Sequence, residues 1–502
     1  MNFGQDSDDS SGLILAAEEC PPELFEQYHR FLPHDDVIIR KLIAHGPVLV
    51  RGGRGSGKSA LLIEAHRRMQ TLPNVFSVYL SLRYLPLLKS DGAEYVTHFC
   101  GILSNAIRNE LRLRKMGIGF AAATDQLTLQ QNLLTLAQSL QRRIVLLFDD
   151  AAHIGREKPL ESFFDLFRTL SSGLVSCKAS IYPGVTKFGV RFDVYNDSTV
   201  TDISRSDVAA FPSFFPAVVK ARYPSLAERG RFSDRLSPEE FANILGRAVV
   251  GNLRGLILAC NRFESESSIG IPQLTRCFVD MATSYFWPLM EEVEPKLGVY
   301  AAMIQPASEV VSIMVEQEVR VARDKRNGIP SDRVLVHRQI VSQYMKIFEI
   351  LEYLGFVAKR EASRGMKSGG RGAVYAMNLC NLLEQVPSKR LTEEMIQEWI
   401  AGTSEPAELH SNGSAFADVN LPVLPEEHGD LEIFEKEISV LGQSQAYPYG
   451  LSEKIIQRLK DAGLTTVGML AEASDERLDS IDYIGEVRIA AIKAVVYQAI
   501  WM

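Results

Sequence analysis

The sequence predicts an α/β protein in which a parallel sheet flanked by helices is followed by smaller, mostly helical domains. Three observations support this fold class. Between residues 21 and 206, short apolar runs typical of buried strands alternate with long stretches of helical periodicity. Charge shifts along the chain mark separate regions. The length of 502 residues, 46% of them apolar, suits about three domains and excludes a wholly disordered chain.

The predicted strands of the first region are Val48–Val50, Val75–Leu82, Ile144–Phe148 and Ala179–Tyr182. Long helical patterns separate them, as parallel strands require, because each crossover needs a dozen or more residues. After residue 206 the pattern turns helical. One helix opens with Ser237, Pro238 and two glutamates, which is a typical helix start. This region is therefore predicted to be a small helical subdomain.

The C-terminal half contains a basic stretch and an acidic one. From Arg320 to Asn378, twelve Lys and Arg face five acids, whereas from Gly402 to Ile438 nine acids face one lysine. The acidic composition, with several Pro, Gly, Ser and Asn, is typical of a solvated linker. The predicted regions are a flexible N-terminus (1–20), the α/β core (21–206), a helical lid (207–268), a helical connector with a basic module (269–400), the acidic linker (401–445) and a C-terminal module (446–502).

Composition and residue patterns also argue against a secreted protein, a membrane-spanning protein and a protein stabilised by zinc or disulfides. The first residues are acidic where a secretory signal would be basic and then apolar, and we find no uncharged apolar run long enough for a membrane span. The six cysteines form no CxxC pair, so neither a zinc site nor a disulfide framework is indicated. We therefore expect a cytoplasmic protein, without a membrane partner, whose cysteines are reduced.

The strongest motif is a GxxxxGK[ST] sequence that directly follows the first predicted strand and precedes a helical run. Glycines let backbone amides converge on phosphate oxygens, and the helix N-terminus adds partial positive charge. In such a loop the lysine reaches the β and γ phosphates and the final hydroxyl binds Mg²⁺. The predicted binding residues are Gly52, Gly53, Arg54, Gly55, Ser56, Gly57, Lys58 and Ser59.

A second motif is a pair of carboxylates, Asp149 and Asp150, directly after the predicted strand Ile144–Phe148. At this strand end Asp149 is placed to meet the Mg²⁺ shell, while Asp150 is close enough to orient an attacking water. Together with the glycine-rich loop, this predicts a P-loop NTPase core that uses ATP and Mg²⁺, with Ser59 and Asp149 at the metal.

In motif order the chain resembles the AAA+ ATPases, nearest to the origin-recognition and initiator type. This resemblance implies a polar sensor at Thr186, an arginine finger at Arg191 that acts on a neighbouring subunit, and a second sensor at Arg254 in the Gly-Asn-Leu-Arg of the lid. Thr186 and Arg191 also suit a plain turn former and a solvated charge. The finger implies a homo-oligomer.

Asp150 departs from the family, in which the second acid is usually Glu. Its carboxylate would lie about 1.5 Å farther from the water, and misplacement on that scale costs up to about 100-fold in rate, so we expect slow turnover. The Asp-Asp pair also resembles the signal-transducing NTPases of the NB-ARC type, which use the nucleotide as a switch.

The basic module resembles the winged-helix domain that initiator ATPases carry. Val334 to Gly355 has helical spacing, and Phe356–Arg360 and Ala373–Met377 have the pattern of two strands that flank a Gly/Lys/Arg loop. A solvated hairpin or a protein-contact surface is the alternative. Cations on the wing would contribute salt-sensitive affinity for duplex DNA. The predicted DNA-binding residues are Lys359, Arg360, Arg364, Lys367 and Arg371.

The C-terminal module resembles tandem helix-hairpin-helix domains, with glycine turns at Gly463 and Gly485. It carries six cations and eight acids, so a protein partner is as well supported as DNA contact. We expect the acidic linker to let it move independently.

The sequence thus predicts an ATP-binding, slowly hydrolysing AAA+ protein that binds duplex DNA through a winged helix and switches its assembly or partners with nucleotide state. A STAND-like signalling or defence scaffold that acts through protein partners is the alternative. A nucleotide kinase is a remote third reading, because no lid for an acceptor substrate is recognisable.

Overall fold

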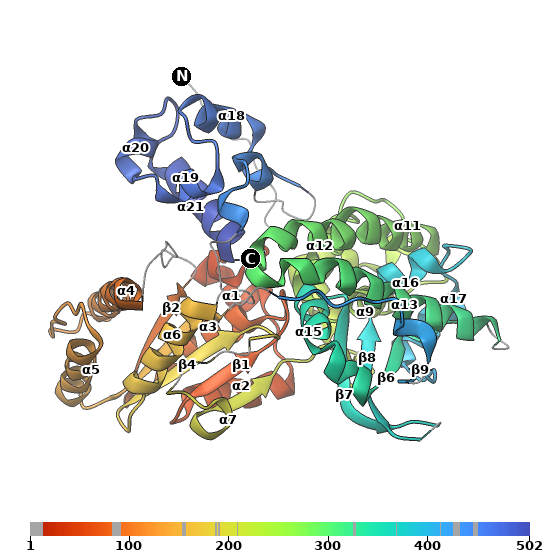
Figure 1. The fold of residues 1–502 in the computed structure, drawn as a ribbon, viewed down its shortest axis with the longest axis horizontal. Helices are drawn as coiled ribbons and strands as arrows, with labels where there is room; N and C mark the ends of the chain where they lie inside the picture. Colours follow the sequence, from red (N-terminus) through yellow and green to blue (C-terminus); the bar gives the residue numbers. More distant parts are fainter. Residues whose placement is uncertain are drawn as a thin grey trace.

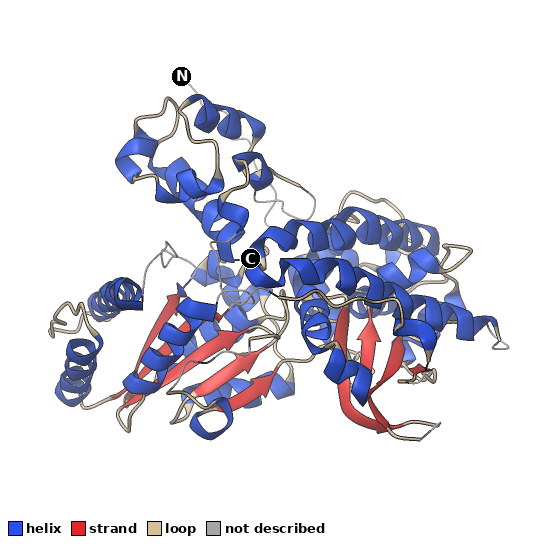
Figure 2. Cartoon of the chain, in the orientation of Figure 1, coloured by secondary structure: helices blue, strands red, loops and turns tan. Residues whose placement is uncertain are grey.

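The computed structural model describes residues 14–82, 92–152, 157–185, 188, 191–207, 209–324, 328–367, 369–411, 413–424, 432–444 and 450–501. An α/β core, a second domain with its own small sheet, and a helical C-terminal module pack together (Figures 1 and 2). In Figure 1 the C-terminal module lies above the core, and the second domain lies to the right of the core.

The core sheet has five parallel strands in the order β2-β3-β4-β1-β5. Their bounds are β1 (Val48–Arg51), β2 (Val75–Ser81), β3 (Arg143–Ala152), β4 (Val175–Ile181) and β5 (Thr199–Asp202). The predicted parallel sheet is confirmed. Three details differ. Strand β3 continues past Phe148 to Ala152 and so includes Asp149 and Asp150. Strand β4 begins four residues before its predicted start because Ser176 and Lys178 interrupt its apolar run, and the short polar edge strand β5 was not predicted.

Helices cover both faces of this sheet. One apolar cluster joins α2 (Pro33–Ile43) and α3 (Lys58–Gln70) to Val48 and Val50, and another joins α4 (Gly92–Leu113), α5 (Gln126–Leu140) and α6 (Glu157–Leu170) to Leu49. Alternate strand residues thus face opposite layers. The preceding helix α1 (Pro22–Tyr28) and the 3₁₀ turn η1 (Ala17–Glu19) lie beside α3.

The helical lid consists of α8 (Phe214–Arg222), α9 (Pro238–Ala248) and α10 (Leu253–Asn261). The start of α9 is a capping box: the Ser237 side chain accepts a hydrogen bond from the Glu240 amide, and the Glu240 carboxylate accepts one from the Ser237 amide. The predicted helix start is confirmed. Helices α11 (Ile271–Met281) and α12 (Trp287–Val293) lead onward to the second domain.

In chain order the second domain has a helix, a strand, two helices and a β-hairpin. Its elements are α13 (Ile304–Arg323), β6 (Arg333–His337), α14 (Arg338–Gln343), α15 (Met345–Leu354), β7 (Val357–Gly365) and β8 (Arg371–Met377), followed by α16 (Leu379–Gln385), α17 (Glu393–Ala401) and β9 (Ala407–Leu409). The sheet order is β7-β8-β6-β9.

Two expectations for this region were wrong. The predicted helical stretch begins as strand β6, because Val334 to Val336 pair with β8 and their β-branched residues fill the sheet. The predicted acidic linker begins with β9, which pairs in parallel with β6. Glu318 of α13 holds β9 there, since its fully buried carboxylate accepts hydrogen bonds from the amides of Ala407 and Ser331.

The stretch Gly298–Arg323, which includes α13, is long and apolar enough to cross a membrane by length and composition, and half of its most apolar window is buried within the protein. Helix α13 packs against α15 and α16. Its apolar character is therefore explained by its place in the core of the second domain.

The C-terminal module contains α18 (Glu453–Asp461), α19 (Val467–Glu472), α20 (Asp475–Asp479) and α21 (Glu486–Trp501). Its apolar residues belong to the same buried cluster as the core layer of α4 to α6, and its helix α21 reaches the junction of core and second domain (Figure 1). This packing differs from the expectation that the module moves independently. All six cysteines of the chain are buried and free.

Candidate nucleotide-binding site

The glycine-rich loop joins β1 to α3, as the sequence predicts. Gly55 and Gly57 adopt left-handed backbone conformations, with φ of 74° and 91°. A Cβ at Gly55 would lie 2.0 Å from the Asn252 side-chain oxygen, so the lid can approach the loop only where the residue is glycine. The loop and the first turn of α3 line a cavity. Backbone amides at a helix N-terminus are groups that bind phosphate.

Lys58 is almost fully buried and folds back on the loop. Its Nζ donates hydrogen bonds to the carbonyl oxygens of Gly52 (2.9 Å) and Gly53 (3.0 Å), and lies 3.6 Å from the centre of the Tyr182 ring. Burial lowers the pKa of Lys58 to about 7, and the nearby carboxylates of Asp150 and Asp149 oppose this shift. The ammonium is thus placed to exchange its carbonyl partners for phosphate oxygens.

The carboxylate of Asp149 is held at both oxygens. Oδ2 accepts a hydrogen bond from the Tyr79 hydroxyl of β2 (2.7 Å), and Oδ1 accepts one from the Ser180 hydroxyl of β4 (2.6 Å) and one from the Asp150 amide (3.0 Å). Donors from both neighbouring strands therefore fix its orientation. Ser59 and Asp149 offer hard oxygen ligands, which is the donor chemistry that Mg²⁺ prefers.

Asp150 occupies a strained backbone position. Its φ is 50°, and the pairing of β3 with β4 is irregular between Phe148 and Ala152. A non-glycine residue in the left-handed region costs of order 1–3 kcal/mol and is typical of functional sites. The Asp150 carboxylate lines the cavity with Lys58 and accepts a hydrogen bond from the Tyr182 hydroxyl at 3.3 Å.

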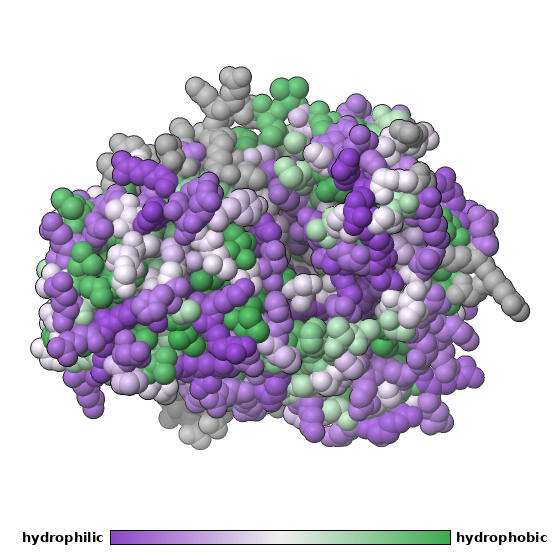
Figure 3. Space-filling view, turned by 90° about the horizontal axis from the view of Figure 1, so that it is seen from below, coloured by the Kyte–Doolittle hydropathy of each residue, from purple (hydrophilic) through white to green (hydrophobic). Residues whose placement is uncertain are grey.

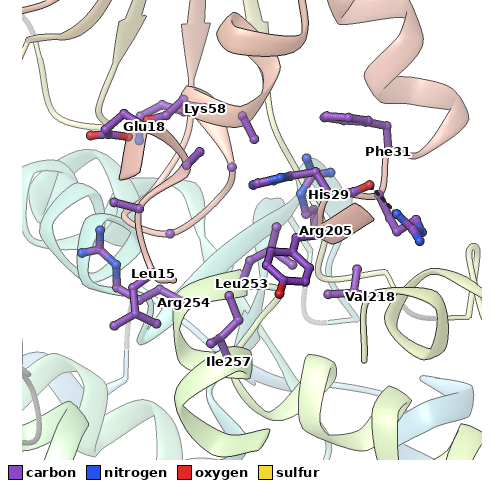
Figure 4. A pocket seen from close by; sticks show the side chains of 18 of the residues that line it. Leu15, Glu18, His29, Phe31, Lys58, Arg205, Val218, Leu253, Arg254 and Ile257 are labelled. Atoms are coloured by element: carbon purple, nitrogen blue, oxygen red, sulfur yellow. Dashed lines mark hydrogen bonds between the residues drawn. The ribbon is translucent and has the colours of Figure 1, made fainter. Parts of the chain in front are cut away.

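Arg254 reaches the same cavity from the lid. It lies in the first turn of α10, where Asn252 caps the helix by accepting a hydrogen bond from the Gly255 amide. The Leu253 amide donates to the Gly55 carbonyl at 2.8 Å. The lid is thus attached to the glycine-rich loop, and Arg254 faces the phosphate region (Figure 4).

Beyond the phosphate region, the cavity is lined mainly by apolar side chains. Figure 4 shows His29 and Phe31 on one side and Leu253 and Ile257 on the other. Val218 of α8 also lines this part. A pocket with an apolar end and a polar, cationic end suits a nucleotide base and its phosphates.

Among the residues of the site that sequence reasoning missed are Tyr182 and Arg205. Tyr182 contacts both Lys58 and Asp150, and its only sequence signal is that it directly follows β4. Arg205 donates from Nε to the Ser56 carbonyl (3.0 Å) and from a terminal nitrogen to both oxygens of the buried Asp35 (2.9 Å each). No local pattern links Asp35 to Arg205, so only the fold reveals this clamp.

Several predicted residues do not line this cavity. Asp149 is fully buried beside Asp150, and Gly52, Gly53, Arg54 and Ser56 line a neighbouring pocket toward the second domain. Thr186, the predicted sensor, lies outside the described residues. Arg191 is exposed, and its backbone amide donates to the Asp165 carboxylate at 3.1 Å. It does not line the cavity of its own chain. An exposed position is compatible with a role at a neighbouring subunit, which stays a prediction.

The second domain packs against the outer side of the glycine-rich loop. The Arg54 amide donates to the Tyr353 carbonyl of α15 at 2.9 Å, and a Cβ at Gly53 would lie 2.5 Å from the Glu352 carbonyl oxygen. Lys346 of α15 donates to the Gly184 carbonyl at 2.6 Å. The Tyr182 and Tyr353 rings meet edge to face at 5.0 Å. Helix α15 is thus docked on the core.

The five predicted DNA-binding cations lie on the β7–β8 hairpin, and each has a partner within the chain. Figure 3, which views the molecule from below, shows a mostly hydrophilic face with scattered hydrophobic residues. The pairs are Lys359 with Glu352 (3.9 Å), Arg360 with Asp207 (2.6 Å), Arg364 with Glu361, Lys367 with Glu405, and Arg371 with the Ser363 hydroxyl (2.6 Å). Much of the positive charge of the hairpin is therefore compensated within the chain.

No family model matches the chain, and neither does any curated protein. Among solved structures, Cdc6p from Pyrobaculum aerophilum is 12% identical, with 76% of this chain and 99% of that chain covered and a TM-score of 0.33. The Aeropyrum pernix ORC1 protein in complex with DNA is 14% identical, with 76% and 95% covered and a TM-score of 0.33.

A third similar structure is the Signal Transduction ATPase with Numerous Domains (STAND) protein with a tetratricopeptide repeat sensor from Pyrococcus horikoshii. It is 12% identical, with 76% of this chain and 46% of that chain covered and a TM-score of 0.26. The structural neighbours are thus of the Cdc6 and ORC type that the motif order resembles, with a STAND protein among them. Because all three TM-scores are below 0.5, we base the function on the residues of the site alone.

Proposed function

We propose that this chain binds ATP with Mg²⁺ in the cavity at the N-terminus of α3 and hydrolyses it slowly. The observation that carries this proposal is the convergence of Lys58, Asp150 and Arg254 on one cavity, although they come from three separate parts of the chain. A cationic cradle beside two carboxylates is the arrangement that phosphoryl transfer requires.

Each residue has a role that its position supports. Backbone amides of the glycine-rich loop and the Lys58 ammonium would bind the β and γ phosphates. Ser59 and Asp149 would hold the ion, which neutralises phosphate charge when bound. Asp150 would orient the attacking water, and Arg254 would contact the γ phosphate from the lid. Slow turnover follows because Asp150 is short and already engaged by the Tyr182 hydroxyl.

We further propose that the nucleotide controls assembly and the binding of duplex DNA. In the structure α15 is docked on the loop and the hairpin cations are paired, so this conformation presents little DNA-binding surface. Undocking of the second domain would expose both. Arg191 would complete the site of a neighbouring copy, which would link nucleotide binding to oligomerisation.

The alternative is a STAND-like switch that acts on protein partners. The docking of α15 supports this alternative too, since a domain held against the nucleotide loop suits a signalling switch as well as a DNA reader. The C-terminal module, with more acids than bases, would then recruit a protein partner.

Calorimetry with Mg²⁺ and ATP or ADP tests the nucleotide proposal. We expect the wild type to bind both and Lys58→Ala to lose at least tenfold in affinity, because the phosphates lose a charged hydrogen-bond donor. Lys454→Ala, at an exposed lysine of the C-terminal module, is the matched control. No binding by the wild type, or equal binding by Lys58→Ala, would contradict the proposal.

Sizing of the chain with and without ATP and duplex DNA tests the switch. We expect a nucleotide-dependent change in assembly and DNA affinity that falls with salt. Neutralising Lys367 and Arg371 should weaken the DNA complex. DNA binding that is absent in every nucleotide state would favour the STAND-like alternative instead.

A further inference from the structure

The apolar end of the cavity contains one side chain with a fixed hydrogen-bonding character. His29 follows α1, and its Nδ1 lies 3.0 Å from the Phe25 carbonyl oxygen, while its ring stacks on the Phe25 ring at 4.1 Å. A carbonyl only accepts, so Nδ1 must carry the proton. The other ring nitrogen, Nε2, is therefore an acceptor whenever the imidazole is neutral.

The surroundings keep the imidazole neutral. Burial, followed by the positive charge of Arg222, lowers the pKa of His29 to about 4. Among the residues that the structure describes, none donates a hydrogen bond to Nε2 of His29. This nitrogen thus offers a lone pair on the wall of the cavity, on the side opposite Leu253 and Ile257 (Figure 4).

The other polar groups at this end are committed elsewhere. Arg30 donates to the carbonyl oxygens of Glu26, Gln27 and His29, and Arg205 donates to the Ser56 carbonyl and the Asp35 carboxylate. Arg222 donates from Nε to the Tyr28 carbonyl (3.3 Å) and from a terminal nitrogen to the Ile14 carbonyl (2.7 Å), and its guanidinium lies over the Tyr28 ring. These bonds leave His29 as the polar side chain that faces the apolar wall. A base that is inserted here would therefore meet an acceptor.

We propose that His29 is a specificity-determining residue that selects a purine with an amino group, and not a carbonyl oxygen, at position 6. This inference rests on the proposed nucleotide site. With phosphates at Lys58, the base lies at the far end of the cavity, between His29 and the lid. The 6-amino group of adenine donates a hydrogen bond, whereas the 6-oxygen of hypoxanthine or guanine accepts one and would face the His29 lone pair.

The test compares the binding of ATP and ITP, which share the ribose and triphosphate and differ at the 6-position edge of the base. We expect the wild type to prefer ATP by about 10- to 100-fold, the range of one well-placed polar pair. His29→Gln should reduce this preference to within about threefold, mainly through tighter ITP binding, because the amide can turn to present either a donor or an acceptor. His66→Gln, at another partly buried histidine of the core, should behave as wild type.

A measurement on the wild type alone keeps the inference testable if the variant fails to fold. Purine riboside triphosphate, which has only hydrogen at position 6, should bind between ATP and ITP. Equal wild-type affinity for all three would overturn the inference, and so would an equal loss of ATP and ITP binding in His29→Gln. If the wild type binds nucleotides through Lys58 without this preference, the proposed function stands and only the inference fails. If it binds none, both fail.

Discussion

The contact between α15 and the core should make stability depend on pH through Glu352. This carboxyl lies where α15 meets the glycine-rich loop, and its side chain is 18% exposed. Burial raises the pKa of Glu352 from 4.5 to about 7, although Lys359 at 3.9 Å and Arg51 oppose the shift, while the charges of Glu349 and Asp202 add to it.

The raised pKa of Glu352 sets the sign and size of this pH dependence of stability. Between pH 4.5 and about 7 the folded state binds more protons at Glu352 than the unfolded state does, so the free energy of unfolding falls as pH rises. At 1.36 kcal/mol per pKa unit the full cost is at most about 3 kcal/mol, reached above the folded pKa. Partial exposure reduces this, so we expect about 1–2 kcal/mol between pH 5.5 and 8.0.

Glu352→Gln removes the charge and should therefore stabilise the protein at pH 8.0 far more than at pH 5.5. Urea denaturation midpoints of wild type and variant at both pH values measure this difference. Glu316→Gln, at an exposed glutamate of α13, is the control and should show no such change. A stabilisation that is equal at both pH values, or a loss of stability at pH 8.0, would refute the linkage.

Two further predictions concern the proposed switch. Tyr182→Phe keeps the ring beneath Lys58 but removes the hydroxyl that engages Asp150. The single-turnover hydrolysis rate should therefore rise by about tenfold, while ADP affinity stays within about twofold. Tyr95→Phe, at a buried tyrosine stacked on Phe99, is the control, and an unchanged rate in Tyr182→Phe would show that the hydroxyl plays no part. The double change Glu405→Gln and Glu408→Gln removes two acids that contact Lys367: Glu405 pairs with its ammonium, and Glu408 accepts a hydrogen bond from its amide. Duplex DNA affinity should then rise several-fold at low salt, and the slope of log affinity against log salt should steepen by about one unit. Glu393→Gln with Glu394→Gln on α17 is the matched control, and DNA binding that does not respond to the Glu405 and Glu408 changes would show that β9 does not shield the hairpin.

Features with a local physical cause could be predicted from the residues alone. The glycine-rich loop, the capping box at Ser237 and the buried strand that carries Asp149, which continues to Ala152, each depend on residues that are close together in the chain. Their spacing therefore carried the information, and the structure placed each of them as a strand, turn or helix end where it was expected. The helical character of the C-terminal module, seen in α18 to α21, was predictable for the same reason.

Contacts between residues that are distant in the chain became visible only in the folded protein. Tyr79 and Ser180 hold Asp149 because parallel pairing places β2 and β4 on either side of β3. The clamp of Asp35 on Arg205 and the docking of α15 on Arg54 likewise join segments more than 150 residues apart. Such contacts leave no periodic trace in the sequence, because each is made by one side chain or one carbonyl whose partner is set by the packing of whole layers.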